Sequence, residues 1–294
     1  MLYDLAALAA ACSIALSNLI APPAIRHLGP VVFNCWRLAA ALVAVLGLVV
    51  CRGSFALPST AQFLALTASS VLGIITADSC FYAAMARLGP RRTSVLYTSW
   101  AAFAAVLGYV LLGETLSLVK VLGIGGVVGG VCLAIIFRQA GKPVASEATH
   151  GSLPAGIVFG LLSAVCAAGA VLIARPVMAS GLDPALATAI RAAVGLPGLV
   201  AISYLPGFRT EAPVTLPIAL RAALSGVLGM GVGMTLVLFA LSGQPIGIVS
   251  TLSSTTPVVI LPLLWWQTGV RPAPAAWLGA ACAVIGAAAI ASGY

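Results

Sequence analysis

The sequence predicts an all-α membrane protein of ten transmembrane helices, arranged as two inverted five-helix repeats around a central cavity. Three observations support this fold class. Only 7% of the 294 residues are charged and 62% are hydrophobic, whereas a soluble domain carries roughly 25% charged residues. Apolar runs of about 20 residues, the length that crosses a bilayer as a helix, follow one another along the chain. The second half also repeats residues of the first half.

The repeat is visible residue by residue, at offsets that drift only from 153 through 154 to 156. In the first stretch Leu19, Ile20, Ala21 and Pro23 match Leu172, Ile173, Ala174 and Pro176, and Leu28, Pro30, Arg37 and Ala39 match Leu182, Pro184, Arg191 and Ala193. In the second stretch Gly113, Leu122, Gly123 and Gly130 match Gly269, Leu278, Gly279 and Gly286. One duplicated unit of about 150 residues explains all three offsets. In an apolar chain such a repeat is typical of transporters that bind their substrate between the halves.

The first half contains five apolar runs, separated by proline, glycine or charged residues. Their separators are, in order, Pro22 to Pro30, Arg52 to Pro58, Arg87 to Arg92, and Gly113 to Glu114. The predicted spans are 3–21, 31–51, 61–86, 92–112 and 117–137. The first run lacks the basic flank of a secretory signal, and its only early charge is Asp4. We therefore expect the first helix to remain in the protein.

The second half follows the same plan. Its runs are separated, in order, by Arg175 to Pro184, Pro206 to Pro217, Gly243 to Pro245, and Gly269 to Pro274. The predicted spans are 153–174, 184–204, 217–241, 246–266 and 274–292. Because each half has an odd number of spans, the second half enters the membrane from the opposite side, which makes the repeats inverted. The predicted organisation is a first repeat over 1–138, a polar linker over 139–151 and a second repeat over 152–294.

Charge, cysteine and histidine content argue against nucleic-acid binding, metal binding and catalysis. The net charge is +8, but the basic residues are scattered and form no stripe with aromatic residues, so we expect no nucleic-acid partner. Seven cysteines without a CxxC spacing predict neither disulfides nor a metal site, and we expect no cofactor. The only histidines, His27 and His150, belong to no triad or HExxH motif. We therefore expect that the chain is not an enzyme.

Asp78 is the most unusual residue, because it is the only acidic side chain well inside a predicted span. An acid buried in hydrocarbon costs several kcal/mol, so it usually faces a cavity or a partner. One interpretation is a pocket residue that binds a substrate ammonium or carries a proton. The alternative is a structural partner for an arginine.

Aromatic residues follow Asp78 along the chain. Tyr97 and Trp100 are three residues apart and share a helix face, and Phe81 and Tyr82 lie on the preceding span. They predict an aromatic wall of the cavity, to which we add Ser99 as a candidate substrate-binding residue. The alternative for Trp100 is the aromatic belt at the membrane surface. That belt is the expected place of the remaining tryptophans, which are Trp36, Trp265, Trp266 and Trp277.

Polar residues near prolines provide further candidates. Six hydroxyl residues lie between Ser250 and Thr256, ahead of Pro257. Proline removes an amide donor, and nearby hydroxyls can satisfy the freed carbonyls. We expect a broken helix whose Ser253, Ser254 and Thr256 line a polar cavity, the alternative being a kinked packing helix. Asn18, just before Pro22, is a candidate on the same argument.

Two features of the repeat are predicted to be structural. Arg37 and Arg191 are equivalent, and each could hold a substrate carboxylate. Because both halves keep the arginine, we favour a packing or interfacial role. The GxxxG patterns in Gly125–Gly130 allow close helix contact. They predict a seam between the fifth and tenth spans or a dimer interface.

Several of these residues match a known pattern. NCWRLAAAL after Pro30 resembles the second helix of the EamA-type branch of the drug/metabolite transporter superfamily. The block AMARLGPRRTSVLYTSWAAFAAVLGYVLLGETLSLVKVLGIGGVVGG resembles that family's most diagnostic region, with Gly113, Glu114 and Gly123 at its recurrent positions. The second half keeps Gly269 and Gly279 but has Val270 in place of the acid. The resemblance covers nearly the whole chain.

The resemblance implies a ten-helix secondary carrier in the inner membrane of a bacterium. Together with the aromatic candidates it leads us to expect export of small metabolites, most of all aromatic or other apolar amino acids, by alternating access. The aromatic amino-acid exporters are the branch that fits these residues. A broad-specificity drug or cation carrier is the alternative. The expected partners are a small-molecule substrate and the lipid bilayer, and the expected assembly is a monomer or weak homodimer.

Overall fold

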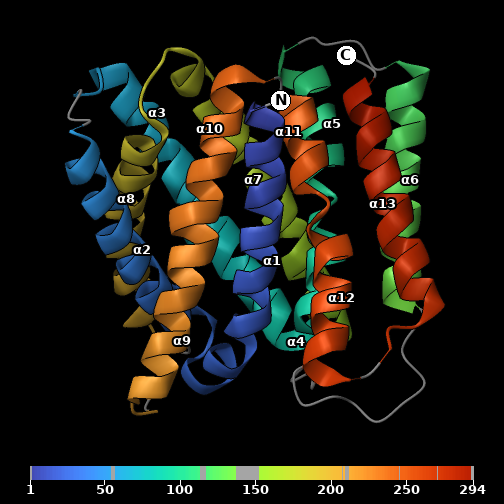
Figure 1. Ribbon diagram of the computed structural model, residues 1–294, viewed down its shortest axis with the longest axis horizontal. Helices are drawn as coiled ribbons and strands as arrows, with labels where there is room; N and C mark the ends of the chain where they lie inside the picture. The colour runs from blue at the N-terminus through green and yellow to red at the C-terminus, as the bar shows by residue number, and fades with distance from the viewer. Residues whose placement is uncertain are drawn as a thin grey trace.

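All regular secondary structure that the computed structural model describes is helical, and long helices stand side by side (Figure 1). The described residues are 2–53, 57–112, 117–136, 152–206, 208, 212–244, 246–269 and 271–292. The predicted linker 139–151, Gly113, Glu114 and Val270 lie outside them. The first half contains α1 (Leu2–Leu28), α2 (Pro30–Arg52), α3 (Thr60–Ser70), η1 (Val71–Asp78), α4 (Ser79–Tyr97), α5 (Trp100–Leu112) and α6 (Leu118–Ile136). The second half contains α7 (Leu153–Ala179), α8 (Pro184–Ser203), α9 (Leu216–Gly226), η3 (Val227–Met234), α10 (Thr235–Gly243), α11 (Ile246–Ser253), α12 (Thr256–Thr268) and α13 (Pro274–Ser292).

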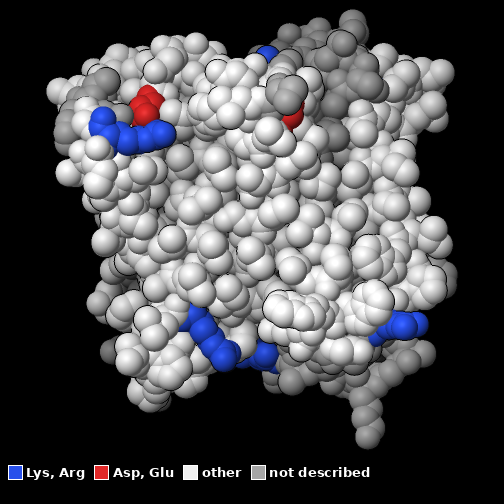
Figure 2. Space-filling view, viewed as in Figure 1, with Lys and Arg blue, Asp and Glu red and all other residues white. Residues whose placement is uncertain are grey.

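Six helical stretches among the described residues are long and apolar enough to cross a membrane. They are 2–28, 30–52, 60–97, 153–179, 184–203 and 216–243. The other predicted spans fall on shorter or interrupted helices, so the count of ten spans stays a prediction. On the face shown in Figure 2, charged side chains lie near the upper and lower edges of the view, and a broad uncharged band lies between them. Such a band suits contact with lipid.

Two glycine–proline pairs turn the chain between helices in the first half. Gly29 precedes α2 with φ of 76° and ψ of 163°, and Gly89 has φ of 78° and ψ of 168° within the stretch 60–97. Glycine adopts positive φ without steric cost, and the following proline disfavours a helical conformation in the residue before it. The conformation of Gly89 separates the third predicted span from the fourth at the expected position.

Helix irregularities recur at equivalent positions of the two halves. The π-helical segments η1 and η3 are 156 residues apart, and so are the interruptions at Thr98–Ser99 and Ser254–Thr255. The hydroxyl of Ser99 donates to the carbonyl of Leu96 at 2.6 Å, and that of Thr255 donates to the carbonyl of Leu252 at 2.7 Å. Hydroxyls thus satisfy backbone acceptors at both breaks. The ninth predicted span is a broken helix, as expected, and the fourth is broken in the same way, which the sequence analysis missed.

Contacts between the halves are reciprocal. Segments α3 and η1 pack on α7 and α8, while α9 and η3 pack on α1 and α2. The hydroxyl of Ser69 donates to the carbonyl of Ala170 at 2.7 Å, and the equivalent Ser225 donates to the carbonyl of Ser17 at 3.3 Å. Each half therefore offers the same surfaces to the other, as an approximate two-fold relation requires.

Helices α6 and α13 lie side by side at one end of the molecule (Figure 1). A Cβ atom on Gly130 would lie 2.5 Å from the carbonyl oxygen of Gly279, and one on Gly286 would lie 2.5 Å from that of Gly123. Only glycine permits backbones to approach so closely. Of the two interpretations of the GxxxG patterns, the structure shows the seam within one chain.

Candidate functional site

A cavity of about 130 Å³ lies between the two halves. Its lining comes from α1, α2, η1, α4 and α5 of the first half and from α7, α8, η3, α10, α11 and α12 of the second. Both π-helical segments and both helix interruptions therefore border it. Backbone irregularities of this kind are tolerated within a membrane where they line a cavity or are buried in protein.

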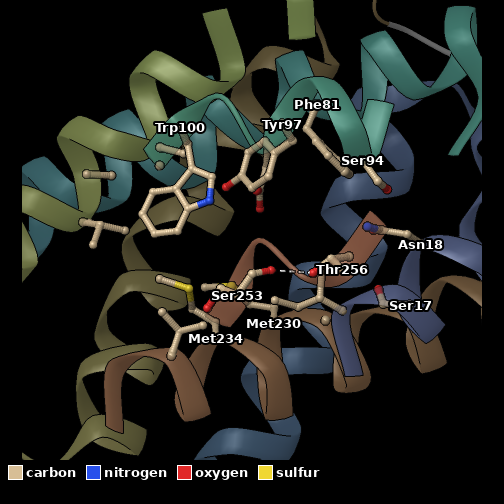
Figure 3. A pocket seen from close by; sticks show the side chains of 18 of the residues that line it. Ser17, Asn18, Phe81, Ser94, Tyr97, Trp100, Met230, Met234, Ser253 and Thr256 are labelled. Carbon is tan, nitrogen blue, oxygen red and sulfur yellow. Dashed lines mark hydrogen bonds between the residues drawn. The ribbon is translucent and has the colours of Figure 1, made fainter. Parts of the chain in front are cut away.

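Four aromatic side chains form one wall of the cavity. Trp100 begins α5, Tyr97 ends α4, and Phe81 and Tyr82 lie near the start of α4. The ring centroids of Phe81 and Tyr97 are 5.1 Å apart, and those of Phe81 and Tyr82 are 5.3 Å apart, both edge to face. Figure 3 shows Trp100 and Tyr97 across the open space from Ser253 and Met234. The structure thus brings together the aromatic residues that the sequence analysis grouped, and it gives Trp100 a buried position.

The other tryptophans of the aromatic-belt prediction lie at the surface. The exposed fractions of Trp36, Trp265, Trp266 and Trp277 are 44%, 40%, 87% and 36%. Trp100, by contrast, is 5% exposed. These values separate Trp100 from the residues that face the surroundings of the protein.

Asp78 lies at the end of η1 and forms an ion pair with Arg37 of α2. The Nη1 atom of Arg37 is 3.0 Å from Oδ2 of Asp78 and 3.0 Å from Oδ1 of Asn34. The Arg37 guanidinium also stacks over the Tyr82 ring, with its central carbon 5.0 Å from the ring centroid. Asp78 therefore has the arginine partner that was the alternative to a direct substrate contact, although its carboxylate still lines the cavity.

Arg191 of α8, the repeat equivalent of Arg37, also lines the cavity. Its exposed fraction is 2%, and its Nε and Nη1 atoms have no hydrogen-bond partner among the described residues. A Cβ atom on Gly73 would lie 2.8 Å from its Nη2 atom, so the glycine of η1 makes room for the guanidinium. Gly229 of η3 accommodates Arg37 in the same manner, since a Cβ atom there would lie 3.3 Å from Nη2 of Arg37.

Hydroxyl groups lie opposite the aromatic wall. The hydroxyls of Ser253 and Ser254 are buried and have no partner among the described residues, while Thr256 donates to the carbonyl of Ser253 at 2.8 Å (Figure 3). Asn18 of α1 lines the same cavity. Buried polar atoms without a protein partner usually bind water or a ligand, so these groups suit the polar part of a small molecule.

The cavity lining includes the candidates Asn18, Asp78, Phe81, Tyr82, Tyr97, Trp100, Ser253, Ser254 and Thr256. Ser99 is not among the lining residues, and its hydroxyl donates to the carbonyl of Leu96 at 2.6 Å.

Sequence reasoning missed two residues of the lining, Arg37 and Arg191, which it took to be packing or interfacial residues. Both are buried and neither reaches the surface. Each lies seven residues after the proline that starts its helix, which corresponds to a depth of about 10 Å at 1.5 Å per residue. That spacing was the signal that could have identified them.

Comparisons with known proteins agree with this architecture. The model of the EamA-like transporter family matches residues 1–136 and 154–292. A solved structure described only as "Crystal structure of protein" is 17% identical, covers 98% of this chain and 94% of its own, and superposes with a TM-score of 0.69. That likeness concerns the fold alone. A search of curated proteins found no match. The two matched regions cover nearly the whole chain, and it therefore belongs to the EamA-like transporter family, whose members are multi-pass membrane carriers and not enzymes.

Proposed function

We propose that this carrier exports small metabolites, most of all aromatic or other apolar amino acids, through the cavity between its two halves. The observation that carries the proposal is the composition of the cavity lining. Four aromatic side chains, buried hydroxyls and two guanidiniums line the same cavity. Aromatic rings pack favourably on one another edge to face or offset, while the polar groups suit a charged headgroup. The proposed substrate-binding residues are those candidates of the lining other than Asp78, which pairs with Arg37 beside the cavity.

The proposed mechanism is alternating access by a secondary carrier in a bacterial inner membrane. The halves, 1–138 and 152–294, would form inverted five-helix repeats joined by the linker 139–151. Reciprocal contacts between the halves and the recurrence of helix breaks 156 residues apart support this arrangement. Rocking of one half against the other would then open the same cavity to either side in turn. The glycine-rich surfaces of α6 and α13 pack on each other within one chain. They are therefore not free to form a dimer interface, which favours a monomer.

The alternative of a cation or drug carrier receives no specific support from the cavity. Asp78 is the only carboxylate among the described lining residues, and Arg37 already neutralises it. A cationic substrate would have to displace a buried guanidinium at 3.0 Å. Broad competition by organic cations would restore this alternative.

Counterflow of labelled amino acids in proteoliposomes tests the proposal. Wild-type protein should accumulate labelled phenylalanine against unlabelled phenylalanine inside the vesicles. Trp100→Ala removes part of the aromatic wall, and we expect at least a tenfold higher half-saturating concentration, because a buried aromatic ring contributes large contact area to a bound ring. Trp266→Ala is the matched control, since Trp266 is 87% exposed. Unchanged counterflow in Trp100→Ala and Tyr82→Ala would refute the aromatic wall as a binding surface.

Energy coupling is tested in the same vesicles. Proton-coupled export requires a pH gradient to drive accumulation, whereas facilitated diffusion gives only equilibration. We propose facilitated diffusion, because Asp78 is engaged by Arg37 and is the only acidic residue of the described lining. Accumulation that depends on the gradient, and that Asp78→Asn abolishes while counterflow persists, would show proton coupling instead.

A further inference from the structure

The repeat shows what Arg191 lacks. Its equivalent, Arg37, is satisfied by Asn34, Asp78 and the ring of Tyr82. At the offsets of the repeat, these three residues correspond to Thr188, Met234 and Leu238. The first half therefore surrounds its arginine with an amide, a carboxylate and an aromatic face, whereas the second half has replaced all three.

None of the three replacements can neutralise a guanidinium. Met234 and Leu238 carry neither a charge nor a strong acceptor. The hydroxyl of Thr188 donates to the carbonyl of Pro184 at 2.8 Å and accepts from Thr235 at 3.1 Å. Consistently, the Nε and Nη1 atoms of Arg191 have no hydrogen-bond partner among the described residues. The second half therefore has the buried guanidinium of Arg191 without the amide, carboxylate and aromatic ring that contact its equivalent in the first half.

The charge of the cavity follows from this difference. Among the described residues of the lining, the charged groups are Arg37, Arg191 and Asp78. Asp78 pairs with Arg37 at 3.0 Å and also interacts electrostatically with Arg191. The three groups together leave one net positive charge, and Arg191 is the guanidinium of the described lining that has no ion-pair contact. An uncompensated charge away from water is costly, and a bound anion with a matching geometry relieves that cost. A carboxylate fits best, because its two oxygens match the two parallel donors of a guanidinium.

We propose that Arg191 binds the carboxylate of the transported molecule, and that the ammonium group of an amino acid contributes little to binding. This inference rests on the proposed function and sharpens it. The substrates are carboxylic acids with an aromatic or apolar body, with or without an amino group. The aromatic wall contacts the body, while Asp78 stays with Arg37 instead of binding an ammonium.

Three compounds that share one phenyl body test the proposal on the unmodified protein. L-Phenylalanine has both charged groups, 3-phenylpropionate has only the carboxylate, and 2-phenylethylamine has only the ammonium. We expect inhibition constants for counterflow that agree within about threefold for the first two and rise about tenfold to hundredfold for the amine, the usual effect of losing a hydrogen bond to a charged group. Equal or stronger binding of the amine overturns the proposal.

Variants then assign the effect to Arg191. Arg191→Met should weaken binding of 3-phenylpropionate about tenfold to hundredfold and change binding of the amine by less than about threefold. Arg191→Lys keeps the charge without the paired donors, so we expect an intermediate affinity. Arg221→Met, at an exposed position of α9, is the matched control for loss of one positive charge. Full affinity for the acid in a folded Arg191→Met protein overturns the proposal.

A second acid and amine pair separates this inference from the proposed function. 4-Methylpentanoate and 3-methylbutylamine replace the phenyl body by a branched aliphatic one. If only the aliphatic acid binds, and does so through Arg191, the preference for aromatic amino acids fails while the carboxylate site stands. If phenylalanine is carried without any preference for acids over amines, the carboxylate site fails while the function stands. If no carboxylate in the panel binds, the carboxylate site is refuted.

Discussion

At the scale of single residues, the ion pair of Arg37 and Asp78 joins two distant parts of the first half. The guanidinium comes from α2 and the carboxylate from the end of η1, and their atoms meet at 3.0 Å. Arg37 is buried and the side chain of Asp78 is 26% exposed, so the guanidinium in particular depends on the carboxylate for its neutralisation. Asp78 therefore has a structural role at the cavity, where it neutralises Arg37.

The pair predicts strongly non-additive mutations. Asp78→Leu should lower the free energy of unfolding by about 3–5 kcal/mol, because it leaves the buried guanidinium of Arg37 unpaired. Arg37→Met should cost less, because the carboxylate that it leaves is 26% exposed, and the double variant should recover most of the larger loss. Unfolding of the purified protein in detergent micelles measures the three values. Arg52→Met is the control, since Arg52 is 59% exposed, lies 3.9 Å from Asp183 and should cost less than about 1 kcal/mol. Additive losses in the double variant would show that the charges do not depend on each other.

Residue identity alone predicted part of this site. Trp100 and Asp78 were recognisable because an aromatic cluster and an isolated acid are rare inside apolar spans. The partner of Asp78 was not, because Arg37 lies 41 residues earlier and only tertiary packing decides whether an arginine reaches the surface. Ser99 lies outside the lining and its hydroxyl bonds to Leu96 within the same turn, so its part in substrate binding stays a prediction.

At the scale of secondary structure, glycine determines which helices approach closely. In α6, Gly130 packs directly against α13. A Cβ atom on it would lie only 2.5 Å from backbone atoms of Gly279 and Ala283. One residue earlier, Gly129 is exposed and has no atom within 4 Å of the position of a Cβ. The two neighbours therefore differ in environment while sharing the same helix and the same residue type.

This difference predicts opposite effects of one substitution. Gly130→Ala should destabilise the protein, because α6 and α13 must separate to admit the methyl group, and losses of about 1–3 kcal/mol are typical of overpacking. Gly129→Ala should be neutral or stabilise by up to about 1 kcal/mol, the difference in helix propensity. Thermal unfolding of the two variants side by side gives the comparison. Equal midpoints would contradict the close packing of this seam.

Helices were the most predictable elements, and their interruptions were the least. Long apolar runs such as α1, α2 and α7 are evident from composition. The π-helical segments η1 and η3 have no comparable signature, because the sequence VLGIITAD is apolar and suits an ordinary helix. Their conformation depends on neighbours, such as α7 and α8 for η1, which the sequence does not show.

At the scale of the whole molecule, the two halves share the features that build the fold, and they differ at residues of the cavity. The halves share the arginines, the glycines beside them and the positions of the helix breaks. They differ at Asp78 against Met234 and at Tyr82 against Leu238, which are residues of the cavity or its immediate surroundings. The cavity between two related halves is therefore asymmetric, which suits a molecule with unlike ends.

The central claim is that one cavity between the halves binds the substrate and opens to either side in turn. Ser253 lines that cavity, so Ser253→Cys in a protein without its native cysteines places one reactive thiol there. In oriented proteoliposomes, a membrane-impermeant maleimide should label this thiol when added to either side, and the transported substrate should slow labelling from both sides. Labelling from one side only, or labelling that saturating substrate does not slow, would contradict the claim.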